Sequence, residues 1–182
     1  MGEYKDFFDG LIYKIKERGV AVANTIEMLN VVMIFANVDN LALYTDCKVM
    51  MGNLLDKKLE MEKNNYLAIQ YGLLHKIIYN EFYFKDKEGA INSRKLFVQS
   101  DDCISFVQLL PRKELLTVMV FIRSSDVEEL LMADLCGVLS AVEVVKKEIY
   151  KEPCKPPLDL CVTIGSAHIY PERDLRRIKR SV

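Results

Sequence analysis

The chain has 182 residues, of which 51% are hydrophobic and 28% are charged. This apolar content excludes a disordered chain and predicts a single domain, residues 1–182, with a sizeable core. The 25 basic and 26 acidic residues leave a net charge of -1, so the overall charge does not favour nucleic acid or an anionic membrane as a partner.

Neither a membrane span nor a secretion signal is expected. The chain has no run of about 18 apolar residues, and its first ten residues lack the basic start and apolar stretch of a signal peptide. The five cysteines are odd in number and form no CxxC pair, which favours a reduced cytoplasmic protein over a disulfide framework. With only two histidines in the chain, a His-rich metal site is excluded.

The N-terminal half is predicted to contain two helices and one buried strand. Apolar residues at helical spacing predict helices over 4–18 and 66–79, and Gly19 can end the first of them. A short β-branched run over 31–36 predicts a buried strand.

The C-terminal half is predicted to be richer in strands, over 96–99, 104–110, 115–122 and 158–164. A polar turn from Pro111 to Glu114 joins the second and third of these into a hairpin. A long helix is expected over 126–150, with Asp126 at its start. Helices and strands intermix without strict alternation, so the predicted fold class is α+β, with one mainly antiparallel or mixed sheet flanked by helices.

Four elements that can carry chemistry follow one another in this half. Cys103 lies twenty residues before an Arg-Ser-Ser-Asp motif that begins at Arg123, and Asp134 lies eleven residues after that arginine. A segment with the sequence GSAHIY then supplies His168 and Tyr170, which share one face of an extended chain. A cysteine is a strong nucleophile at neutral pH, and an arginine binds phosphate through a rigid fork of donors.

The order and spacing of these elements resemble the thymidylate synthase family, which includes the deoxycytidylate hydroxymethylases. GSAHIY near the C-terminus looks most like the shorter archaeal and viral members, and the resemblance covers roughly residues 93–170. It implies a thymidylate synthase-like fold, a homodimer, a pyrimidine deoxynucleoside monophosphate as substrate, and 5,10-methylenetetrahydrofolate as cofactor. The implied reaction is transfer of a one-carbon unit to C5 of the pyrimidine.

The resemblance also assigns roles to individual residues. Cys103 is the implied nucleophile, whose thiolate adds to C6 and makes C5 nucleophilic. Arg123 and Ser124 are implied to hold the 5′-phosphate, with Arg94 reaching it across the dimer interface. The full set of implied substrate contacts is Arg94, Arg123, Ser124, Asp126, Asp134, His168 and Tyr170, of which the last two contact the sugar 3′-hydroxyl.

Asp134 stands where the family has an asparagine that reads the uracil edge. A carboxylate can accept a hydrogen bond from N4 of cytosine, and once protonated it can donate to N3. Aspartate at this position is the pattern of the dCMP hydroxymethylases, and a buried polar mismatch discriminates strongly between bases. The predicted activity is therefore dCMP 5-hydroxymethylation.

Two alternatives stay open because the chain departs from the family pattern. Asp101 and Asp102 precede Cys103 where the family has proline, the chain has no tryptophan, and the catalytic glutamate has only Glu60 and Glu62 as candidates. The chain could therefore be a thymidylate synthase acting on dUMP, or a nucleotide-binding or interaction protein that has lost catalysis. A basic cluster in the tail is expected to be a solvated helix face rather than a nucleic-acid site: Arg173, Arg176, Arg177, Lys179 and Arg180.

Overall fold

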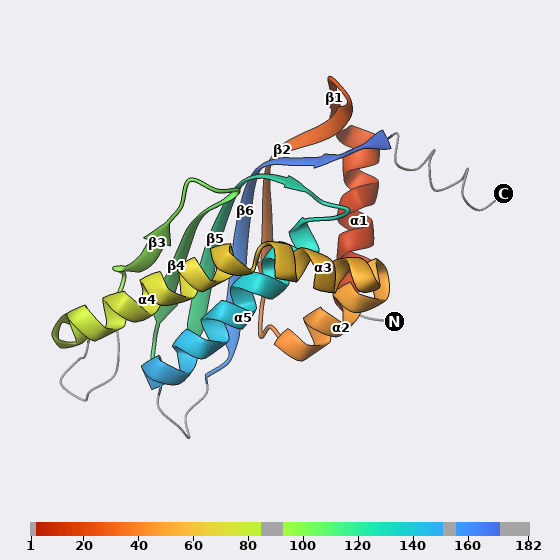
Figure 1. Ribbon diagram of the computed structural model, residues 1–182. Coiled ribbons are helices and arrows are strands. Elements are labelled where there is room, and N and C mark those ends of the chain that lie inside the picture. Colours follow the sequence, from red (N-terminus) through yellow and green to blue (C-terminus); the bar gives the residue numbers. More distant parts are fainter. Residues whose placement is uncertain (1–2, 85–92, 151–155, 172–182) are drawn as a thin grey trace.

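The computed structural model describes residues 3–84, 93–150 and 156–171, in which five helices pack against a six-stranded sheet (Figure 1). The helices are α1 (Glu3–Arg18), α2 (Asn40–Met51), α3 (Asn53–Met61), α4 (Lys63–Phe84) and α5 (Leu131–Tyr150). The strands are β1 (Val20–Val22), β2 (Thr25–Phe35), β3 (Leu96–Gln99), β4 (Ile104–Pro111), β5 (Leu116–Asp126) and β6 (Leu158–Ile169). None of the helices in these residues has the length and apolar character that crossing a membrane requires.

The sheet is mixed, as the sequence predicts. Its strand order is β1-β2-β6-β5-β4-β3, and every neighbouring pair is antiparallel except β5 and β6. Two parallel neighbours need a long crossover connection, and α5 supplies it. The predicted α+β class with one mixed sheet is therefore confirmed.

The core lies between the helices and one face of the sheet. Alternate residues of β5 and β6 are buried on that face, whereas Met119 and Phe121 point to the other face and are partly exposed. Helix α5 contributes the largest number of buried side chains of any helix and packs against α4, α2 and α3. The first turn of α5, which includes Asp134, is therefore buried in the interior.

The sheet bends along a line that crosses its central strands. Asn30 of β2 has a left-handed φ of 55°. In the pairing of β2 with β6, the register skips Asn30 on one strand and Gly165 on the other. The register of β4 also shifts, between Ile104 and Phe106. Gly165 is required at the bend because a Cβ there would lie 2.7 Å from the carbonyl oxygen of Arg123. Bulges of this kind redirect the side chains that follow them.

Several element boundaries differ from the sequence prediction. The helix expected over 126–150 begins at Leu131, because Asp126 is still paired with His168 as the last residue of β5. The carboxylate of Asp126 accepts a hydrogen bond from the backbone N–H of Glu128 at 3.2 Å, so it caps the turn before the helix. Strands β2 and β6 are longer than expected, and the sequence did not predict α2, α3 or β1.

Candidate functional site

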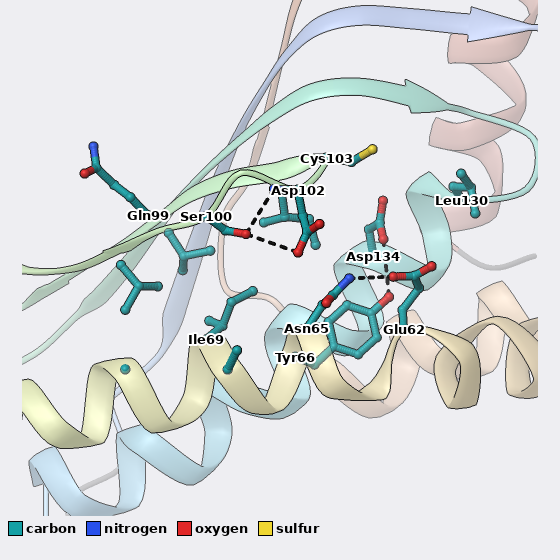
Figure 2. A pocket seen from close by; sticks show the side chains of 15 residues that line it. Glu62, Asn65, Tyr66, Ile69, Gln99, Ser100, Asp102, Cys103, Leu130 and Asp134 are labelled. Carbon is teal, nitrogen blue, oxygen red and sulfur yellow. Dashed lines mark hydrogen bonds between the residues drawn. The ribbon is translucent and has the colours of Figure 1, made fainter.

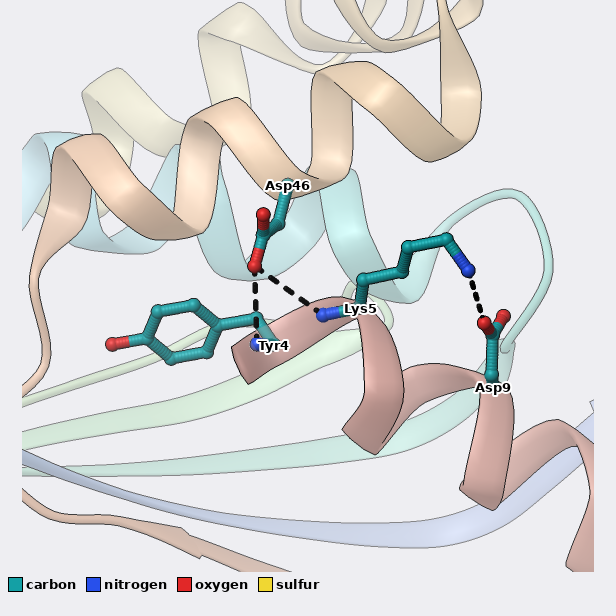
Figure 3. A network of polar contacts seen from close by, with 4 residues as sticks. All are labelled: Tyr4, Lys5, Asp9 and Asp46. Carbon is teal, nitrogen blue, oxygen red and sulfur yellow. Dashed lines mark hydrogen bonds and ion pairs between the residues drawn. The ribbon is translucent and has the colours of Figure 1, made fainter. Parts of the chain in front are cut away.

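A cavity of about 420 Å³ lies between α4, strands β3 and β4, and the start of α5 (Figure 2). This volume is within the range of small-molecule sites. One wall is apolar and includes Ile69, Val98 and Val107. The polar lining residues are Glu62, Asn65, Tyr66, Gln99, Ser100, Asp102, Cys103 and Asp134.

Cys103 lines this cavity as a free, exposed thiol in the bend that precedes β4. The backbone N–H of Arg123 on β5 donates to the carbonyl oxygen of Cys103 at 2.8 Å. The spacing of twenty residues from Cys103 to Arg123 thus spans the β4–β5 hairpin, which brings the backbones of these two residues side by side. The side chain of Arg123 is exposed and is not part of the cavity lining, so the two residues are neighbours through their backbones.

Asp134 enters the cavity from the first turn of α5 and is only 7% exposed. Its Oδ1 accepts a hydrogen bond from the Tyr66 hydroxyl at 3.2 Å. Burial raises the pKa of Asp134 to about 7, since an ionised carboxylate is poorly solvated there. The Tyr66 hydrogen bond lowers this pKa, the negative charge of Glu62 raises it, and the positive charge of Lys58 lowers it. Near neutral pH the side chain can therefore exist as the acid or as the carboxylate.

Glu62 and Asn65 complete the polar end of the cavity. The side-chain amide of Asn65 donates to Oε2 of Glu62 at 2.7 Å, which orients the carboxylate (Figure 2). Of the two glutamates suggested by the sequence, only Glu62 lines the cavity. Glu60 lies at the surface and forms an ion pair with Lys63.

Tyr66 is a site residue that the sequence did not reveal. Its ring is buried against α5, and burial together with the charge of Asp134 raises the pKa of its hydroxyl. The ring occupies space left by Gly137, where an added Cβ would lie 2.3 Å from the Cζ atom of Tyr66. The only sequence signal was the spacing of Glu62, Asn65 and Tyr66, because positions i, i+3 and i+4 share one helix face.

The predicted phosphate and sugar residues gather at the bend of the sheet. The Ser124 hydroxyl and Nδ1 of His168 lie 3.4 Å apart, and the rings of His168 and Tyr170 meet edge to face at 5.4 Å. The Ser166 hydroxyl, on the same strand, donates to Glu27 at 3.0 Å. These residues are outside the lining of the cavity that holds Cys103 and Asp134.

The remaining predicted residues are more scattered. Arg94 is exposed just before β3, and Asp126 is buried beneath the turn that leads to α5. The guanidinium of Arg123 forms no ion pair with any residue that the structure describes. The basic cluster of the tail lies outside the described residues.

Comparisons with known proteins identify the fold. No family model and no curated protein matches the sequence. Among solved structures, thymidylate synthase from T4 phage superposes with a TM-score of 0.57 at 18% identity, over 98% of this chain and 80% of that chain. Thermostable thymidylate synthase A from Bacillus subtilis gives a TM-score of 0.61 at 12% identity, over 97% and 83%. The chain therefore has the thymidylate synthase fold, as the sequence predicts.

Proposed function

We propose that this chain transfers a one-carbon unit to C5 of a pyrimidine deoxynucleotide, and that its substrate is dCMP, which it converts to 5-hydroxymethyl-dCMP. One observation carries the proposal: a free thiol and a buried carboxyl with a pKa of about 7 line the same cavity. The fold shared with thymidylate synthases adds support. In the sequence, the spacing of Cys103 and Asp134 from Arg123 resembles that of the family's nucleophile and base reader.

Cys103 acts as the nucleophile in this proposal. Its thiolate forms a bond to C6 of the pyrimidine, and the C5–C6 double-bond electrons move to C5, which becomes nucleophilic. Once C5 has gained the one-carbon unit, loss of the C5 proton would expel the folate amine and leave a methylene group double-bonded to C5. Water would add to this methylene, and the thiolate would then leave C6 so that the ring becomes aromatic again. Glu62, held by Asn65 at the polar end of the same cavity, is placed to move protons in these steps.

Asp134 reads the base. Cytosine offers a donor at N4 and an acceptor at N3, and a carboxylic acid offers the complementary acceptor and donor. Because burial raises the pKa of Asp134 to about 7, the acid is available at neutral pH without a large energetic penalty. An asparagine at this position would present an amide instead and would suit uracil.

The phosphate and sugar are proposed to bind at the sheet bend. Arg123 supplies an exposed cation there, and Ser124, His168 and Tyr170 supply neutral hydrogen-bonding groups. Asp126 shapes the turn behind these residues by accepting from the Glu128 N–H. Arg94 is proposed to reach a neighbouring subunit's substrate.

The apolar wall of the cavity suits the ring system of a folate cofactor. Ile69, Val98 and Val107 form an apolar wall beside Cys103 that would hold a ring system such as that of 5,10-methylenetetrahydrofolate. When bound, this cofactor supplies the one-carbon unit, and water completes the hydroxymethyl group. The chain's own contribution is to hold that ring against the wall, beside the thiol of Cys103.

A homodimer is proposed to form through the outer face of the sheet. This face carries exposed apolar side chains from two strands, whereas the helices cover the other face. Contiguous apolar surface of this kind marks an interface. The side chains are Leu29, Val32, Ile34, Met119 and Phe121.

Product analysis tests the substrate assignment. Purified protein is incubated with methylenetetrahydrofolate and either dCMP or dUMP, and the nucleotides are analysed by mass spectrometry. We expect 5-hydroxymethyl-dCMP from the wild type, and a shift of preference toward dUMP in the Asp134→Asn variant. An unchanged preference in that variant would remove Asp134 as the base reader, and dTMP from the wild type would identify a thymidylate synthase instead.

A further inference from the structure

We propose that Tyr66 is a positioning residue that selects cytosine over uracil, because its hydroxyl determines which oxygen of Asp134 carries the proton. The inference deepens the proposed function and rests on it. The evidence is the hydrogen bond between Tyr66 and Asp134, the burial of both side chains, and the glycine that lets them meet.

A protonated Asp134 does not by itself distinguish the two bases. Cytosine requires a donor opposite N3 and an acceptor opposite N4, whereas uracil requires an acceptor opposite N3 and a donor opposite O4. A carboxylic acid satisfies the first pattern when one oxygen carries the proton and the second pattern when the other does. Discrimination therefore needs a further group that fixes the position of the proton.

Tyr66 is placed to do this. Its hydroxyl donates to Oδ1 of Asp134 at 3.2 Å, and the other carboxyl oxygen points away from Tyr66 toward the side of the cavity where Cys103 lies (Figure 2). The carbonyl oxygen of an acid accepts a hydrogen bond far better than its hydroxyl oxygen. The Tyr66 bond therefore keeps Oδ1 as the acceptor and holds the acid proton on Oδ2.

The packing of α4 against α5 makes this contact specific. Gly137 lies three residues after Asp134 on α5, and a Cβ there would lie 2.3 Å from the Tyr66 ring. The absence of that Cβ allows the ring to lie against the helix with its hydroxyl at Asp134. Because Tyr66 is only 8% exposed, water competes poorly for this hydroxyl.

Other charged groups around Asp134 act on its ionisation rather than on the position of its proton. Lys58 on α3 lowers the pKa of Asp134, and Glu62 at the junction of α3 and α4 raises it. Asp102 and Cys103 line the opposite side of the cavity. Among the described groups around Asp134, the Tyr66 hydroxyl donates to one of its two oxygens, so it distinguishes Oδ1 from Oδ2.

The test compares the wild type with Tyr66→Phe in the full chain. Dissociation constants for dCMP and dUMP are measured by calorimetry at pH 6 and pH 8, and the Asp134 carboxyl carbon is titrated by NMR. We expect the preference for dCMP at pH 6 to fall about fivefold, the effect of one net hydrogen bond. Since this bond lowers the pKa of Asp134, its titration midpoint should also rise.

A matched control is Tyr79→Phe on the same helix, where the hydroxyl is exposed and lies outside the cavity. It should change neither the preference nor the midpoint. If Tyr66→Phe does not fold by circular dichroism, a 3,5-difluorotyrosine at position 66 keeps the ring and makes a stronger donor, so the preference for dCMP should increase.

Two results would overturn the proposal, and they differ. If the wild type prefers dCMP and loss of the Tyr66 hydroxyl leaves that preference unchanged, Tyr66 has no role in selection, although the proposed function stands. If the folded wild type binds neither nucleotide, the proposed function fails and this inference fails with it.

Discussion

Replacing Asp134 with asparagine is expected to remove a large pH dependence from the stability of this protein. Burial raises the pKa of Asp134 from its ordinary 3.8 to about 7, so between these values the folded state holds a proton that the unfolded state has lost. The free energy of unfolding therefore falls as pH rises from about 4 to about 7, and no further loss occurs above that. At 1.36 kcal/mol for each pKa unit, this one group costs about 4 kcal/mol at pH 8.

Urea unfolding of the wild type and Asp134→Asn across pH 4 to 8, at one protein concentration, measures this effect. The difference in unfolding free energy should be small at pH 4 and should grow to several kcal/mol in favour of the variant at pH 8. Asp101→Asn is a matched control, because Asp101 is exposed beside the same site and should leave the slope unchanged. A difference that does not vary with pH would show that Asp134 is not a buried acid of this kind.

Three further predictions concern the packing and the surfaces, two of them with a control variant. Gly137→Ala should lower the unfolding free energy by about 1–3 kcal/mol, because the Tyr66 ring must move. The control is Gly10→Ala in α1, where an added Cβ meets nothing within 4 Å, and it should raise the unfolding free energy by about 0.5–1 kcal/mol. Equal effects of the two substitutions would contradict this reasoning. Gly165→Ala should separate β6 from the Arg123 carbonyl, which its Cβ would approach to 2.7 Å, and should weaken nucleotide binding in calorimetry; unchanged affinity would place the phosphate and sugar elsewhere. Ile34→Lys on the outer sheet face should yield monomers in light scattering while Leu41→Lys on α2 does not, and dimers in both variants would rule out that face as the interface.

The elements that the sequence predicted have strong patterns of their own. Helices α1 and α4, and strands β3, β4 and β5, show helical or strand-like runs of apolar residues bounded by turn residues. The α2 helix was missed because Leu41, Tyr44 and Val49 are exposed, so its apolar residues do not form one stripe. Its start did carry a signal, since the carboxylate of Asp39 caps it by accepting from the N–H groups of Leu41 and Ala42.

The start of α5 was misplaced for a tertiary reason. Asp126, Glu128 and Glu129 are typical of a helix N-terminus, but pairing with His168 on β6 keeps Asp126 in β5. A turn over residues 127–130 follows, so the helix begins only at Leu131. A neighbouring strand that lies forty residues later in the chain cannot be inferred from local composition.

The sequence singled out two residues of the candidate site, which are its most chemically distinctive ones. Cys103 and Asp134 stand out because a thiol and a carboxylate at those spacings resemble a known pattern, and both line the cavity. Tyr66 could not be found in the same way. Its contact with Asp134 depends on the packing of α4 across Gly137, which exists only once the two helices meet.

The central claim is that Cys103 adds to C6 of a pyrimidine whose base is read as cytosine. It is tested most directly by release of tritium from C5-labelled dCMP and dUMP, with and without methylenetetrahydrofolate. The account predicts that the wild type releases tritium from dCMP. The control variant Cys161→Ser should also release it, because Cys161 lies on the sheet away from the cavity. Cys103→Ser should release none, although it should still bind the nucleotide. Release from dCMP by Cys103→Ser, or no release by folded wild type that binds dCMP, would contradict the account.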